Sequence, residues 1–212
     1  MKIKRISLLI FLLPTITVIL SYIFSLNLGL VSSCLPIIDG CTSISRVGRY
    51  FPVNIFFKTF MFFSGILILY YWYLNYIFFT QFKKPRLIKI SLFLGFFSVF
   101  FLFLYLFFLG ENNYYKYFRK IGIFIYILFS ITSELLLSII YFKNSNKSLF
   151  NNYFIKFKLV LSIGLVSLGV ILFPFMVMEI DNVANLRNII SWNFFLLIQF
   201  NFLLTFLIWG KK

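Results

Sequence analysis

The chain contains no histidine, and only five of its 212 residues are acidic. The missing imidazole removes the commonest general base and the commonest metal ligand, so any catalysis is restricted to carboxylates, cysteine, serine, tyrosine or lysine. The sequence also has no P-loop, dinucleotide fingerprint, metalloprotease helix motif or Gly-x-Ser-x-Gly turn. We therefore expect no metal and no cofactor, and the missing motifs argue against an enzyme.

Charged residues are scarce as well. They make up 12% of the chain, against 62% hydrophobic residues, and the mean hydropathy is +0.99. A water-soluble domain needs far more charge to keep its exterior hydrated, so the exterior of this protein must face lipid. The apolar runs are long and continuous, whereas a membrane β-barrel needs short alternating segments. The composition predicts an all-α, polytopic membrane protein.

The apolar residues form six windows of about 20 residues, the length that crosses about 30 Å of hydrocarbon. These windows cover residues 6–26, 59–79, 90–109, 121–142, 159–178 and 189–209. Only the first connection, 27–58, is long, and it holds both cysteines together with Gly, Pro, Ser and several charges. We predict one domain over 1–212, a bundle of six transmembrane helices with an ordered first loop.

Lysine and arginine accumulate on the cytoplasmic side of membrane spans. The two termini and the connections after the second and fourth windows hold thirteen of them and no carboxylate, with Lys156 and Lys158 in this count. The remaining connections hold seven cations and four carboxylates. We expect both termini in the cytoplasm, in a bacterial inner membrane or in a eukaryotic plasma membrane or endomembrane. The net charge of +15 is split between apolar spans and predicts no nucleic-acid partner.

Two cysteines, Cys34 and Cys41, lie in the first loop. In an oxidising compartment they are candidates for a disulfide that closes a small ring. Spacing alone does not establish the geometry that a disulfide requires, so two unpaired cysteines remain the alternative.

Glu134 lies deep in the fourth window, where a charge is costly and usually faces the bundle interior, a partner or a wet cavity. Polar residues at steps of three or four make it part of a stripe: Tyr126, Ser130, Ser138 and Tyr141. Two sets of residues are candidates to meet this stripe: Thr17, Ser21 and Ser25 in the first window, or Gln199, Asn201 and Thr205 in the last. Two interpretations of Glu134 stay open: a site that binds a cation, a lipid amine or a proton, and a purely structural carboxyl group.

The first loop also contains a Ser-x-Ser-x-x-Gly segment formed by Ser43, Ser45 and Gly48, followed by Pro52 and by the pair Phe57 and Lys58. This pattern resembles the first loop of the Frag/DRAM/Sfk superfamily, which includes damage-regulated autophagy modulators, GPI-anchor remodelling factors and the N-terminal region of the yeast Cwh protein. The resemblance extends to six spans with cytoplasmic termini. Gly48 is expected to adopt a backbone angle closed to other residues, and Pro52 to start the second helix.

The resemblance implies a protein that handles lipid, non-enzymatic or weakly enzymatic, with membrane lipids as partners. We expect Arg46, Arg49 and Lys58 to hold a headgroup phosphate near Asp39, with Glu134 deeper in the bundle. The loop has the alternative of neutralising its own charges. A small transporter or channel with a polar path around Glu134, and a scaffold that assembles with another membrane protein, are the other functions considered.

Overall fold

The computed structural model describes residues 2–81, 85–110, 115–145, 150–177 and 184–209. Within these ranges the chain is helical and contains no strand. Six helices are long and apolar enough to cross a membrane: α1 (Lys2–Asn27), α3 (Val53–Thr80), α4 (Pro85–Phe108), α5 (Lys116–Lys143), α6 (Asn152–Val177) and α7 (Ala184–Ile208). A short helix, α2 (Ile44–Val47), lies in the first loop. The predicted all-α, six-span bundle is confirmed.

The helices are longer than the apolar windows that predict them. α3 begins at Val53 instead of residue 59, and α6 begins at Asn152 instead of residue 159. A hydropathy window measures only the part of a helix that needs lipid, whereas the helix itself continues into the polar interface. Lys58, Lys156 and Lys158 are therefore helical residues.

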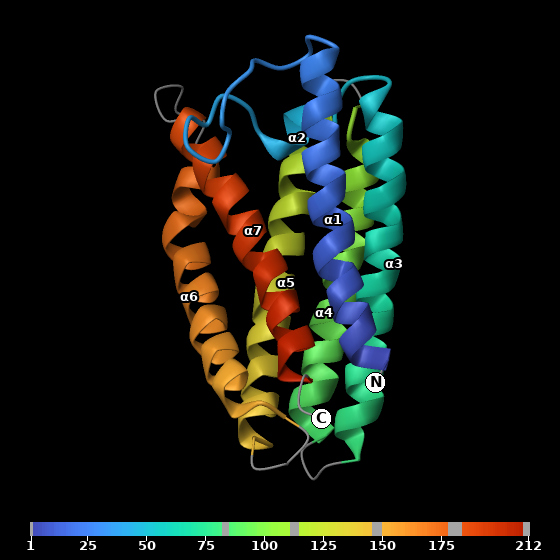
Figure 1. Cartoon of the computed structure of the whole chain (residues 1–212), viewed down its shortest axis with the longest axis vertical. Coiled ribbons are helices and arrows are strands. Elements are labelled where there is room, and N and C mark those ends of the chain that lie inside the picture. The colour runs from blue at the N-terminus through green and yellow to red at the C-terminus, as the bar shows by residue number, and fades with distance from the viewer. Residues whose placement is uncertain (1, 82–84, 111–114, 146–149, 178–183, 210–212) are drawn as a thin grey trace.

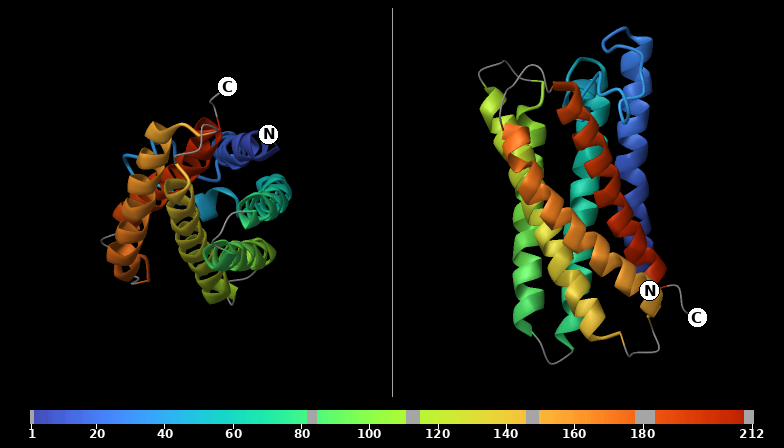
Figure 2. Two further views of the ribbon diagram at one scale, coloured as in Figure 1. Left: turned by 90° about the horizontal axis from the view of Figure 1, so that it is seen from below. Right: turned by 90° about the vertical axis from the view of Figure 1, so that its left-hand side faces the viewer.

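The long helices pack in a closed ring in which each contacts the next along the chain and α7 returns to α1. Both termini lie at one end of the bundle, here called the terminal end, and the first loop covers the other, called the loop end (Figures 1 and 2). The short connections fix this up-and-down order, because each helix must start where its predecessor ended.

The bundle reverses the pattern of a soluble protein. Large aromatic side chains such as Phe93, Phe100 and Phe107 point outward, while serine, threonine and asparagine side chains are buried between helices. In hydrocarbon an unpaired polar group costs several kcal/mol, so polar side chains turn inward where other helices supply partners. Between α4 and α5, for example, the hydroxyls of Ser91 and Ser133 lie 3.2 Å apart.

Small residues set how closely two helices approach. A Cβ added to Gly65 on α3 would lie 2.4 Å from the Phe103 ring on α4, and one added to Gly95 on α4 would lie 2.5 Å from the Trp72 ring on α3. Each aromatic ring therefore occupies the space that the facing glycine leaves free. α3 and α4 can pack closely because an aromatic ring of each helix fits against a glycine of the other.

The first loop is ordered and is tied to three helices. Ser25 on α1 donates to the Val47 carbonyl at 2.8 Å, and Ser45 shares a 2.8 Å hydrogen bond with Tyr105 on α4. Trp192 on α7 donates its indole N–H to the Thr42 carbonyl at 2.9 Å. These bonds make the loop a folded cap over the loop end of the bundle.

A tight turn at Gly40 brings the cap against the start of α7. Gly40 has φ 64°, a left-handed angle, and its carbonyl accepts a 2.7 Å hydrogen bond from Asn188. A Cβ at this position would lie 2.1 Å from the Asn185 carbonyl oxygen. Glycine is thus required here both by the backbone angle and by the close approach of α7.

Gly29 offers a matched control, because it has φ 66° but open space around a Cβ. We expect Gly29→Ala to lower the free energy of unfolding by about 1–2 kcal/mol, the cost of the left-handed angle alone. Gly40→Ala should lose about 1–3 kcal/mol more, because α7 must also shift. Unfolding of both variants in mixed micelles measures the difference, and equal losses would show that α7 does not depend on this contact.

Candidate functional site

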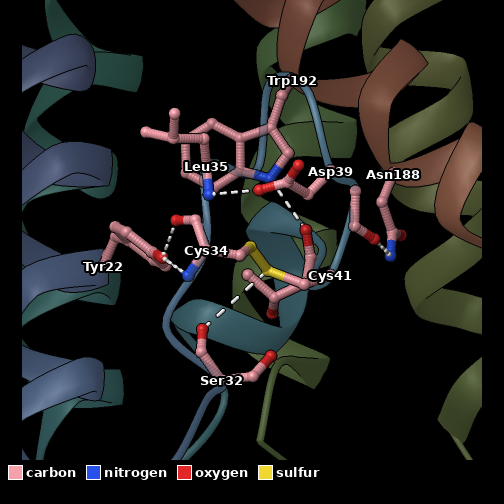
Figure 3. Close-up of a disulfide and its surroundings, with 10 residues drawn as sticks. Tyr22, Ser32, Cys34, Leu35, Asp39, Cys41, Asn188 and Trp192 are labelled. Atoms are coloured by element: carbon pink, nitrogen blue, oxygen red, sulfur yellow. Dashed lines mark hydrogen bonds between the residues drawn. A yellow bond between two sulfur atoms is a disulfide. The ribbon is translucent and has the colours of Figure 1, made fainter.

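Two sites emerge, one in the cap and one between the helices. In the cap, Cys34 and Cys41 are joined in a disulfide with their Cα atoms 6.5 Å apart (Figure 3). The Tyr22 hydroxyl on α1 donates to the Cys34 carbonyl at 2.6 Å and accepts from the Cys34 N–H at 3.2 Å. The closed ring is therefore anchored directly to the end of the first span.

The Asp39 carboxylate is used inside this ring, where it accepts the Leu35 N–H at 2.8 Å (Figure 3). Residues 27–58 are all described, and within them Asp39 forms no ion pair with Arg46, Arg49 or Lys58. The cap therefore does not neutralise its cations through its own carboxylate.

A cavity of about 290 Å³ opens in the cap beside the disulfide. Its lining consists of Gly29, Leu30, Val31, Ser32, Cys41, Thr42 and Arg46, with no carboxylate among them. Thr42 is buried, and its hydroxyl has no hydrogen-bond partner. Arg46 is thus the one charged residue in this lining, and a lone cation with no carboxylate in the same lining suits an anion.

The three cations proposed for phosphate do not all line this cavity. Only Arg46 does. Arg49 lies with Arg119 near the Tyr105 hydroxyl, toward α4 and α5. Lys58 is half-buried on α3, and no ion-pair partner is recorded for it among the described residues.

The residues of the family-like motif serve the cap itself. Ser43 caps α2 by accepting the Arg46 N–H, and Pro52 stands at the N-terminal cap of α3. Gly48 has φ −90°, so the expectation of a special backbone angle was wrong. Glycine is needed there for space instead, because an added Cβ would lie 2.5 Å from the Phe57 ring.

Between the helices, Glu134 on α5 forms a buried ion pair with Lys158 on α6, with Oε2 and Nζ 2.6 Å apart. Lys158 is fully buried and Glu134 is 2% exposed. The Lys158 ammonium also donates to the backbone carbonyl of Asn201 on α7 at 2.9 Å and to the Asn201 side-chain oxygen. All three donor positions of the ammonium are therefore filled, which offsets much of its desolvation.

The polar network closes on itself across three helices. Asn201 donates to Ser162 at 2.8 Å, Ser162 shares a 2.8 Å bond with Ser138, and Ser138 donates to the Glu134 carbonyl at 2.7 Å. Toward the terminal end, hydrogen bonds also join Tyr71 with Thr205 and link Asn75, Tyr141 and Trp209. These contacts bind α3 into the same network.

Sequence reasoning found part of this network and missed its central cation. Asn201 and Thr205 belong to the network, and both were in the candidate set from the last window. In the other set, Thr17 bonds within α1 and Ser25 bonds the cap, so neither reaches Glu134. Lys158 was counted among cytoplasmic cations, although its spacing of four from Ser162 repeats the stripe on α5 and a buried carboxylate needs a cation.

The chain was compared with known proteins, and no protein-family profile, curated protein or solved structure matches it. The resemblance to the Frag/DRAM/Sfk superfamily therefore stays a prediction that rests on the motif residues and the order of the spans.

The ion pair gives a prediction with a matched control. Lys158→Met leaves the Glu134 carboxylate buried and unpaired, and we expect it to lower the free energy of unfolding by about 3–5 kcal/mol. Lys156→Met, an exposed lysine on the same helix, should change it by less than about 0.5 kcal/mol. The double variant Glu134→Leu with Lys158→Met should recover most of the loss in the same micelle unfolding measurement. A loss that persists in the double variant would contradict the pairing.

The disulfide gives a second prediction. Replacing both cysteines with serine frees a short ring, and we expect a loss of about 2–3 kcal/mol in the free energy of unfolding, since short closed loops contribute this much. Limited proteolysis should then cut residues 34–41 faster than in the oxidised protein. Equal proteolysis rates would mean that Tyr22, Asn188 and Trp192 hold the cap without the disulfide.

Proposed function

We propose that this multi-pass membrane protein handles lipid, and that it binds an anionic, phosphate-bearing headgroup in the cap cavity lined by Arg46. The observation that carries this proposal is the composition of the cavity lining, which includes the cation Arg46 and Thr42, whose buried hydroxyl has no partner, and which includes no carboxylate. A phosphate offers only acceptor oxygens, and the planar fork of arginine matches two of them.

The charge balance of the cap supports an anion over the alternative of self-neutralisation. Asp39 accepts a backbone N–H, which leaves Arg46 exposed and without an ion-pair partner in the described chain. In the same lining, the N–H groups of Val31 and Ser32 donate to no group in the described protein. An incoming phosphate would meet donors that are already in place.

The position of the cavity favours a lipid over a dissolved anion. Its lining begins two residues after the end of α1, a helix long and apolar enough to cross a membrane, so a lipid headgroup at that end of the span would be close to it. A second cavity of about 360 Å³ is lined by Phe24, Asn27, Leu28, Pro52, Val53 and Phe56, and its Leu28 directly precedes Gly29 of the first cavity. This mainly apolar groove between the ends of α1 and α3 suits an acyl chain.

The orientation of the protein in the membrane and its family are also part of this proposal, and both are argued from the sequence. Without Lys158, the connections at the terminal end still carry most of the cations, so we place both termini in the cytoplasm and the cap outside. Membership of the Frag/DRAM/Sfk superfamily would agree with lipid handling. The cap motif supports that membership by its residues alone.

The test compares two arginines of equal charge at opposite ends of the bundle. We expect Arg46→Ala to weaken retention of phosphatidylglycerol by about tenfold to a hundredfold, because one hydrogen bond to a charged group contributes about 1.5–3 kcal/mol. Arg86→Ala, an exposed cation near the start of α4, should leave retention unchanged. Native mass spectrometry of the purified proteins with titrated lipid measures both.

Two further arms identify the ligand chemistry. Diacylglycerol, which has the acyl chains but no phosphate, should be retained equally by wild type and Arg46→Ala. Inorganic phosphate should compete weakly if the headgroup dominates and not at all if the acyl groove dominates. Equal phosphatidylglycerol retention by wild type, Arg46→Ala and Thr42→Val would overturn the proposal.

A further inference from the structure

Near the middle of the bundle, three buried side-chain oxygens form no hydrogen bond of good geometry with the described residues, and the Tyr71 hydroxyl, a donor near Glu134, also bonds Thr205. The three oxygens are Oε1 of Glu134, Oγ of Ser130 and Oε1 of Gln199. All three side chains are at most 2% exposed. An unpaired buried polar group costs about 1–3 kcal/mol, and three in one region are a strong indication that something polar meets them.

Contacts of Lys158 show that these three residues lie at a similar depth in the bundle. Ser130 lies one helical turn from Glu134 on the same face of α5. The Lys158 ammonium contacts both Glu134 Oε2, at 2.6 Å, and the Asn201 carbonyl, at 2.9 Å, so α7 passes close to the ion pair at Asn201, and Gln199 lies two residues nearer the loop end on the same helix. The unpaired oxygens therefore come from two helices that meet at the ion pair.

Buried polar side chains are hydrogen-bonded on one side of Glu134 and lack partners on the other. Toward the terminal end, Ser138, Ser162 and Asn201 are all bonded to one another or to the ion pair. Toward the loop end, the buried hydroxyls of Ser21 on α1 and Thr42 in the cap are unpaired. Unsatisfied polar groups thus recur from Glu134 to the cap cavity, which Thr42 lines.

We propose that water enters the bundle from the loop end and reaches Glu134, and that the Glu134–Lys158 network closes the path toward the terminal end. The ion pair is already neutral as a unit, so an added cation would leave a net charge buried in hydrocarbon, whereas water donates to the three acceptors without adding charge. This inference is independent of lipid binding in the cap.

Cysteine reactivity tests this path, because the thiolate and not the thiol is the nucleophile and a thiol in a dry apolar site is inert. Both native cysteines are in the disulfide, so an introduced cysteine is the only free thiol. With methyl methanethiosulfonate, a small neutral reagent, we expect Ser130→Cys to react at least tenfold faster than Ser138→Cys, its buried and hydrogen-bonded neighbour two turns along α5.

Gln199→Cys repeats the comparison on α7 if Ser130→Cys fails to fold, with Ser162→Cys as the bonded control on α6. Reaction of Ser130→Cys and Gln199→Cys as slow as their controls would overturn the path. Faster reaction of Ser138→Cys and Ser162→Cys would also overturn it, because water would then enter from the terminal end.

Discussion

Hydrocarbon offers no hydrogen bonds, and this constraint decides where each polar group of the bundle lies. Backbone groups satisfy it within six long helices, and side chains satisfy it by turning inward. The Glu134–Lys158 ion pair is its most demanding case, because both charges must be met by groups from other helices. Asn201 supplies two acceptors to the ammonium, so α5, α6 and α7 can pack together only in the register that brings these three residues into contact.

The sequence predicts this architecture well because a membrane span is a property of composition over about 20 residues, which needs no knowledge of neighbours. It also identifies Glu134, because a lone carboxylate in an apolar window is anomalous by itself. It does not identify Lys158, because a cation two turns inside a helix start looks the same in a hydropathy window as one in the adjoining connection. The pairing depends on how α5 and α6 rotate about their axes, and only tertiary packing fixes that rotation.

The cap shows the same division between local and tertiary causes. Ser43 as a helix cap and Pro52 at the start of α3 follow from local backbone preferences and are readable in the sequence. Gly48 looks like a residue chosen for its backbone angle, yet its angle is ordinary and the Phe57 ring is what excludes a side chain. Likewise, the three cations near one another in sequence diverge in space, since Arg46 faces the cavity while Arg49 lies toward Tyr105.

The two proposed sites share a mechanical connection through Thr42. Its side chain lines the cap cavity, and its carbonyl accepts the indole N–H of Trp192 on α7. The same helix carries Asn201, which accepts two hydrogen bonds from the Lys158 ammonium of the ion pair. α7 therefore joins the cap to the ion-pair network through two hydrogen bonds, one in each half of the helix, from Trp192 to the Thr42 carbonyl and from Lys158 to the Asn201 carbonyl.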